Sequence, residues 1–128
     1  MAWRESIEVP PVKHGQTPIP FATKVGNMLF TGGIFGANPD TAQMPESVDE
    51  QVANCFALLK KAVEKAGGSM EDVGHVTVFI KDPATRGKVN PVWLQHFPDE
   101  HSRPARHTLT NESFNYQIQI EAIAVLKG

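Results

Sequence analysis

The chain has a single cysteine among its 128 residues, so it cannot form an internal disulfide. Long apolar runs are also missing: no stretch approaches the roughly 20 residues of a membrane-spanning helix, and the first residues lack the apolar core of a signal peptide. Nor is one charge in excess, because 12 Lys and Arg face 14 Asp and Glu, for a net charge of −2. These absences argue against a disulfide scaffold, a membrane protein and a nucleic-acid-binding protein, and favour a cytoplasmic location.

The usual motifs of metal and nucleophile chemistry are missing too. The five histidines are irregularly spaced, and the chain has neither an HExxH sequence nor a pair of cysteines. No serine lies in a Gly-x-Ser-x-Gly turn. The glycines at residues 32–36 are not followed by the Lys-Ser/Thr pair of a phosphate-binding loop. We therefore expect no metal site and no cofactor.

What the sequence does contain is typical of one globular domain spanning residues 1–128. The hydrophobic content is 41% and the charged content is 20%, both ordinary values for a soluble protein. A chain of this length buries roughly two-thirds of its unfolded surface, which is enough for a real core. Residues 10–20 carry four prolines and a glycine, and this composition predicts an extended loop.

A strand hairpin is predicted after this loop. Residues 21–24 and 28–31 have strand character, and the Gly-Asn dipeptide between them suits a tight turn. The second strand runs into Gly32 and Gly33. Two glycines at a strand end indicate a bulge or a backbone that another group approaches closely, unless they form only a flexible turn.

A long helix comes next in the prediction. Ser47 and Glu50 form a capping box, and apolar residues then recur at helical spacing until Gly67 and Gly68 end the pattern. Cys55 falls within the apolar stripe of this helix. We interpret it as a core residue rather than a reactive thiol.

A further strand and a second helix are predicted in the middle of the chain. Residues 73–81 alternate as a strand does, and Asp82-Pro83 is typical of a helix cap followed by proline at the first helical position. Pro91 complicates the helix, because a proline inside a helix removes a hydrogen bond. The helix either kinks there or begins properly with Asn90 as its cap.

The last quarter of the chain holds the candidate site. Residues 117–125 alternate as a half-buried strand, and Glu121 lies where polar residues on one face give way to apolar ones. Desolvation at such a boundary would tune this carboxyl group for general acid–base catalysis. Arg106 opens the preceding strand and offers a planar fork of donors to a carboxylate. The two residues, on neighbouring strands, would form a minimal site for a small acid, unless they simply pair with each other.

Two other polar residues are candidates with alternatives. His107, next to Arg106, either hydrogen-bonds a substrate or packs at the surface on an aromatic ring. Asn90 is either a ligand donor or only the cap of the second helix.

Seven short motifs occur in order along the chain: Gly26-Asn27-Met28, Thr31-Gly32-Gly33, Asn38-Pro39, residues 76–82, Val89-Asn90, Pro104-Ala105-Arg106 and residues 120–125. Together they resemble the reactive-intermediate deaminase (Rid, or YjgF) family from about residue 18 to the end. The resemblance implies an α+β, chorismate-mutase-like fold, in which two helices pack on one face of a mostly antiparallel sheet. It also implies a homotrimer whose sheets form an inner barrel, with clefts between subunits.

The resemblance further implies hydrolysis of reactive enamines and imines, of the 2-aminoacrylate and 2-iminoalkanoate type, to 2-oxo acids and ammonia without metal or cofactor. Arg106 would bind the carboxylate of this small substrate, and Glu121 would orient or activate the attacking water. Gly33 would offer a backbone contact at the reacting end of the substrate, and Asn90 would lie near the cleft. His107 and Phe21 are the remaining substrate-binding positions.

Two features depart from the family pattern. Many members carry a tyrosine in the proline-rich segment, whereas the only tyrosine here is Tyr116, and position 107 is His where those members have Cys, Ser or Thr. Two alternatives therefore stay open. One is a dedicated deaminase of an amino-dicarboxylate such as 2-aminomuconate, whose extra polar group would suit His107. The other is a non-catalytic module on the same trimer that binds small carboxylates.

Overall fold

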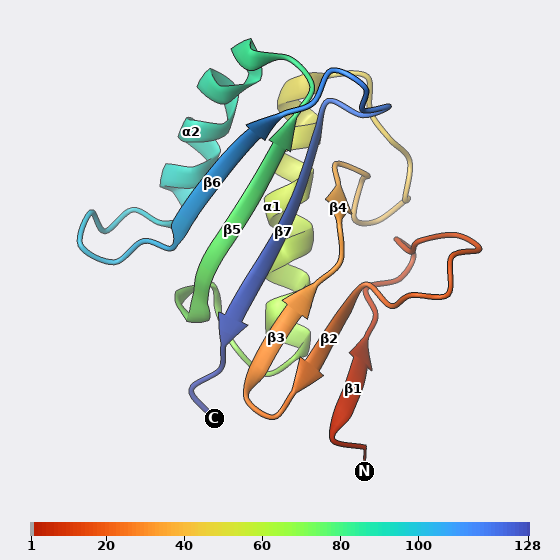
Figure 1. Cartoon of the computed structure of the whole chain (residues 1–128), viewed down its shortest axis with the longest axis vertical. Coiled ribbons are helices and arrows are strands. Elements are labelled where there is room, and N and C mark those ends of the chain that lie inside the picture. The colour runs from red at the N-terminus through yellow and green to blue at the C-terminus, as the bar shows by residue number, and fades with distance from the viewer. Residues whose placement is uncertain (1) are drawn as a thin grey trace.

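The computed structural model describes residues 2–128 and contains one seven-stranded sheet with two helices on one face (Figure 1). The strands are β1 (Arg4–Ile7), β2 (Ala22–Val25), β3 (Met28–Thr31), β4 (Ile34–Phe35), β5 (Val73–Ile80), β6 (Ala105–Thr110) and β7 (Ile118–Val125). The helices are α1 (Val48–Lys65) and α2 (Arg86–His96), with 3-10 turns η1 (Met70–Asp72) before β5 and η2 (Pro83–Thr85) before α2.

The sheet is mostly antiparallel, as expected. Its strand order is β1-β2-β3-β7-β5-β6, and β4 pairs with β7 beyond the end of β3. The β5–β6 pair alone among these strands is parallel, with α2 in the connection between the two strands. The expected α+β architecture with two helices on one face is confirmed.

The predicted hairpin is present, with Val25 opposite Met28 and Gly26 in the left-handed conformation at φ +59°. The sequence pattern missed β1, which extends the hairpin by pairing with β2. It also missed the two-residue strand β4.

Helix α1 forms where it was predicted and lies across the sheet. Ser47 Oγ accepts a 3.3 Å hydrogen bond from the Glu50 backbone N–H, so the first half of the capping box is formed. The helix ends before Gly67, whose φ of +98° suits glycine. Cys55 is fully buried and its Sγ donates to the Ile34 carbonyl at 3.4 Å. Burial raises the pKa of this thiol far above its usual range, as suits a core residue.

Helix α2 continues through Pro91, so the alternative in which it begins with Asn90 as its cap is wrong. Asp82 caps the 3-10 turn η2, where its Oδ1 accepts from the Ala84 N–H at 2.9 Å, and α2 follows directly. The helix runs from Arg86 through Pro91 to His96, so Asn90 lies inside it and is not its cap.

The two faces of the sheet have different surroundings. The face covered by α1 and α2 carries the core, to which β5 and β7 contribute Val76, Val78, Ile80, Ile118, Ile120, Ala122 and Ala124. The opposite face, toward the viewer in Figure 1, is uncovered and keeps several large apolar side chains partly exposed: Phe30 (38%), Leu109 (41%), Ile123 (38%) and Val125 (50%). No helix within residues 2–128 is long and apolar enough to cross a membrane.

Candidate functional site

Arg106 lies on the helix-covered side of the edge strand β6, because its register partner on β5 is the buried Val76. Its Nη2 donates a 2.8 Å hydrogen bond to Asn90 Oδ1 of α2, and its guanidinium carbon is 4.9 Å from the centroid of the Trp93 ring. Burial, and then the positive charge of Arg86, lower the pKa of Arg106. A guanidinium nevertheless remains charged at neutral pH. The structure thus brings Asn90 and Arg106 together.

The charge of Arg106 has no acidic partner in the described part of the chain. The ion pairs there are Lys61–Asp40, Lys88–Asp49, His101–Glu100 and Lys127–Glu71. An open cavity of about 410 Å³ borders Arg106, Asn90 and Trp93. A guanidinium fixed by an aromatic ring and an amide, but left without a counter-ion, is suited to bind the carboxylate of a ligand.

Glu121 lies on the opposite, uncovered face of the sheet. Its register partner on β5 is Thr77, and Thr77 also pairs with His107 on β6, so these three residues form one row across that face. The prediction that Arg106 and Glu121 lie on neighbouring strands was wrong, because β5 lies between β6 and β7. The pair suggested as an alternative is also excluded within one chain, because the two side chains project from opposite faces.

The boundary between polar and apolar surroundings that was expected at Glu121 is not formed within one chain. Glu121 and Ile123 are both exposed, so burial within a single chain does not desolvate this carboxylate. A shallow cavity of about 200 Å³ lies beside it, between Phe30, His75 and Thr77. Glu121 therefore needs a second molecule, either another protein chain or a ligand, to become shielded from water.

The Gly33 backbone is closely approached by another part of the chain, so Gly33 does not belong to a flexible turn. A Cβ at this position would overlap the Gln119 side chain, and the Gly33 carbonyl accepts a 2.9 Å hydrogen bond from His14 Nε2. Phe21 is buried nearby, and its carbonyl accepts from the Gly32 N–H at 2.9 Å. Hydrogen bonds to His14 and to Phe21 thus fix the backbone at Gly33 and at the preceding Gly32.

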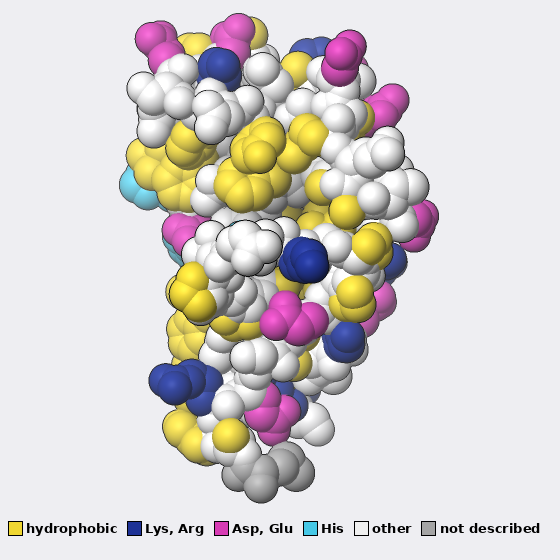
Figure 2. Space-filling model, turned by 90° about the vertical axis from the view of Figure 1, so that its right-hand side faces the viewer, with side chains coloured by type: hydrophobic (Ala, Val, Ile, Leu, Met, Phe, Trp, Pro, Cys, Tyr) yellow, Lys and Arg dark blue, Asp and Glu magenta, His cyan; other side chains and the backbone are white. Residues whose placement is uncertain are grey.

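Phe21 and Gly33 together line a cavity of about 370 Å³ between the proline-rich segment and the loop that follows β4. Figure 2 views the molecule from the side on which these two segments lie, and hydrophobic side chains gather over its upper half. His14 lines the same cavity and lies 6.1 Å from the Phe21 ring, centroid to centroid. Sequence reasoning missed His14, because nothing in the local pattern of residues 10–20 indicates that this histidine turns inward.

Comparison with known proteins identifies the family. The sequence model of the protein family described as Endoribonuclease L-PSP matches residues 17–126. The chain belongs to this family, the Rid (YjgF) family. A RutC family protein from Aquifex aeolicus is 31% identical over 121 residues, which cover 89% of this chain and 97% of that protein. The 2-iminobutanoate/2-iminopropanoate deaminase of Escherichia coli is 34% identical over 104 residues, covering 79% of this chain and 81% of the relative.

Solved structures of E. coli proteins share the fold of this Rid-family chain. TdcF with bound serine superposes with a TM-score of 0.85 at 29% identity, covering 94% of this chain and 98% of TdcF. The YjgF gene product superposes with a TM-score of 0.84 at 30% identity, with the same coverage.

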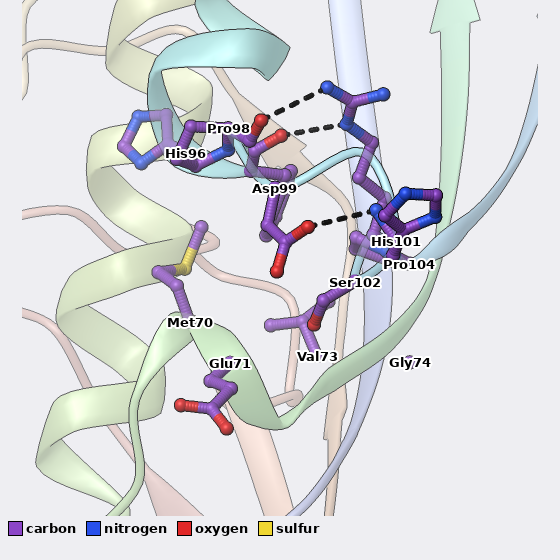
Figure 3. Close-up of a pocket in the computed structure, with 12 residues that line it drawn as sticks. Met70, Glu71, Val73, Gly74, His96, Pro98, Asp99, His101, Ser102 and Pro104 are labelled. Carbon is purple, nitrogen blue, oxygen red and sulfur yellow. Dashed lines mark hydrogen bonds between the residues drawn. The ribbon is translucent and has the colours of Figure 1, made fainter.

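Another cavity of this Rid-family chain, of about 500 Å³, contains none of the predicted site residues (Figure 3). Two of its charged residues, Arg103 and Asp99, hold the loop after α2. Arg103 donates through Nε to the Phe97 carbonyl at 2.8 Å and through Nη2 to the Pro98 carbonyl at 3.2 Å. Asp99 Oδ1 accepts from the His101 backbone N–H at 2.9 Å. We therefore interpret this cavity as a consequence of how the loop after α2 folds, and not as the site of the reaction.

The predicted site residues thus fall into three groups within one Rid-family chain. Arg106 lies with Asn90 at the α2–β6 edge, Glu121 lies in one row with His107 on the uncovered face, and Gly33 lies with Phe21 at the second cavity. Residues 2–128 contain no cluster of three or more His, Cys, Asp or Glu side chains arranged to hold a metal ion.

Proposed function

We propose that the protein hydrolyses reactive imines and enamines of small amino acids, such as 2-iminopropanoate and 2-iminobutanoate, to 2-oxo acids and ammonia. The observation that carries this proposal is the guanidinium of Arg106, which is fixed by Trp93 and Asn90 and has no acidic partner in residues 2–128. The E. coli relative named 2-iminobutanoate/2-iminopropanoate deaminase and the TdcF structure with bound serine support a small amino-acid-like substrate.

The proposed reaction needs few groups. Arg106 binds the substrate carboxylate, and Glu121 orients a water molecule and accepts its proton as the oxygen attacks the imine carbon. That proton passes to the imine nitrogen and gives the carbinolamine. Glu121 then moves the hydroxyl proton to the same nitrogen as the C–N bond breaks, which releases the 2-oxo acid and ammonia. One water is consumed for each ammonia released, and no electrons are exchanged.

We further propose that the active unit is a homotrimer with its sites between subunits. Arg106 and Glu121 project from opposite faces of one sheet, so a single chain does not present both to one small substrate. The uncovered face exposes Phe30, Ile123 and Val125, which a second copy would bury. Neither a membrane nor nucleic acid is proposed as a partner, because the net charge of −2 gives no basic surface to attract phosphates.

Turnover of freshly generated imines tests the proposed function. An amino-acid oxidase produces 2-iminopropanoate and 2-iminobutanoate in situ, and semicarbazide reports how fast the imine disappears. The Arg106→Ala variant should lose about 2–4 kcal/mol of transition-state stabilisation, as is usual for a lost charged contact. Lys65→Ala removes an exposed cation from α1 and serves as the matched control. Near-normal turnover by Arg106→Ala would contradict the assignment.

Mixed trimers test the shared site. Arg106→Ala and Glu121→Ala chains, each expected to be inactive alone, are co-expressed with different tags and purified together. If Arg106 of one subunit meets Glu121 of its neighbour, one of the three clefts in every mixed trimer regains both residues, so trimers selected through both tags should recover about a third of the normal activity. Mixed trimers no more active than the separate variants would contradict a site shared between Arg106 of one subunit and Glu121 of another.

A second candidate is a non-catalytic module that binds small carboxylates. The separation of Arg106 from Glu121 favours it, because a carboxylate can bind at Arg106 without meeting the glutamate. Binding without turnover by the unmodified protein would support this function. In that case Arg106→Ala should abolish binding, and Glu121→Ala should hardly change it.

A further inference from the structure

We propose that the cavity beside Gly33 binds the side chain of the imino-acid substrate, so that imines with a bulky apolar side chain are preferred over 2-iminopropanoate. This inference rests on the proposed function and names the substrate class of the same site. It concerns the cavity of about 370 Å³ between the proline-rich segment and the loop after β4.

The size and lining of the cavity match an apolar ligand group. Its volume lies within the range of roughly 300–1,000 Å³ typical of small-molecule pockets. Its apolar and aromatic lining comes from separate parts of the chain and includes Val12, Phe21, Phe35, Ala37, Met44 and Tyr116. A branched aliphatic or phenyl group would fill space that the methyl group of 2-iminopropanoate leaves empty.

The walls of the cavity are already formed. The rings of Phe35 and Tyr116 pack with their centroids 4.5 Å apart. In the loop after β4, Asn38 Oδ1 accepts from the backbone N–H groups of Asp40 at 2.8 Å and Thr41 at 3.1 Å. Ala42, which lines the cavity, is held at φ +65°, a conformation that alanine seldom adopts. A loop fixed in this way keeps the cavity open in the absence of ligand.

Gly33 connects the cavity to the reacting end of the substrate. It lines the cavity, and it lies against the side chain of Gln119, which is two residues from Glu121 on β7 and therefore on the same face of the sheet. His14, a half-buried residue of the lining, donates through Nε2 to the Gly33 carbonyl at 2.9 Å, and its Nδ1 is buried without a hydrogen-bond partner in residues 2–128. An uncharged imidazole that donates through Nε2 has only an acceptor at Nδ1, and an acceptor does not bind a carboxylate. The cationic group that remains, Lys13, is exposed. The interior therefore suits hydrocarbon better than a second carboxylate.

The test compares imines made in situ from alanine, leucine, phenylalanine and aspartate by suitable amino-acid oxidases, with semicarbazide as the reporter. We expect kcat/KM for the leucine- or phenylalanine-derived imine to exceed that for the alanine-derived imine at least about tenfold, as is typical for an apolar pocket that is filled rather than empty. Binding of the stable products, 4-methyl-2-oxopentanoate against pyruvate, gives a readout that does not depend on turnover and should show the same preference.

A substitution that fills the cavity tests whether the cavity determines the substrate preference. Met44→Trp, at a half-buried lining residue, should lower the ratio of phenylalanine to alanine turnover about tenfold or more, whereas Lys65→Trp on the outside of α1 should leave this ratio unchanged. Equal turnover of all imines, or preference for the alanine- or aspartate-derived imine, would overturn the inference and leave the deaminase function standing. Turnover of no imine by the unmodified protein would instead overturn the proposed function.

Discussion

Arg106 owes its position to two side chains of α2 rather than to its own strand. The Trp93 ring lies under the guanidinium, and the Asn90 carbonyl oxygen accepts one of its hydrogen bonds. Both contacts orient the group without neutralising it. The donors left free are therefore the ones that a carboxylate ligand can use.

Asn90→Ala should weaken carboxylate binding without abolishing turnover. The substitution removes one hydrogen bond to the arginine, which contributes about 0.5–1.5 kcal/mol, so KM should rise by up to about tenfold while kcat changes less. Steady-state kinetics on 2-iminobutanoate would separate the two constants. A fall in kcat at constant KM would instead assign Asn90 to the chemical step, and loss of folding by circular dichroism would assign it to stability.

At the scale of elements, a close contact between the sheet and helix α1 lies where β4 ends. Gly36 follows β4, and a Cβ there would overlap the backbone of Gln51 in α1. The Gly36 carbonyl also accepts a 3.0 Å hydrogen bond from Asn54 Nδ2. This approach fixes where the loop that forms one wall of the second cavity begins.

Two glycine substitutions should therefore have opposite effects on stability. Gly36→Ala forces α1 away from the sheet and should destabilise the protein by about 1–3 kcal/mol, as overpacking does. Gly87→Ala, at an open position within α2, should stabilise it by roughly 0.5–1 kcal/mol through helix propensity. Urea unfolding at one protein concentration would measure both. An unchanged midpoint for Gly36→Ala would mean that the helix–sheet contact can relax.

Elements with a strong local signal were predictable from the sequence. Helix α1 has a cap, a long apolar stripe and a terminating glycine, and the β2–β3 hairpin has its Gly-Asn turn. Strands β1 and β4 were missed because they are short and become strands only by pairing with β2 and β7. The sequence left open whether α2 continues through Pro91, because proline disfavours a helix interior. In the structure η2 supplies a first turn, and Val89 and Trp93 anchor the helix in the core.

The candidate site was only partly predictable for a related reason. Residue types and motif order indicated Arg106 and Glu121, but local alternation does not reveal which strands become neighbours. The parallel return of β6 beside β5 separates the two residues and places them on opposite faces. The contact between His14 and Gly33 spans 19 residues of sequence and depends on how the proline-rich loop folds back.

At the scale of the whole molecule, the uncovered sheet face should decide assembly. Ile123→Glu places a charge among the exposed apolar residues of that face, so it should dissociate the proposed trimer and abolish turnover together with it. Light scattering would give the mass. Ala53→Glu adds the same charge at an exposed position of α1 and should leave the trimer intact. An unmodified protein that is monomeric at micromolar concentration would contradict both the trimer and the shared site.

The placement of Arg106 and Glu121 on opposite faces has a genetic consequence. In the proposed trimer each subunit supplies its arginine to one cleft and its glutamate to another, so a chain that has lost one of the two residues still completes a cleft with a suitable neighbour. A cell carrying two different defective alleles, one for each residue, would then retain partial activity. Two alleles defective at the same residue would retain none.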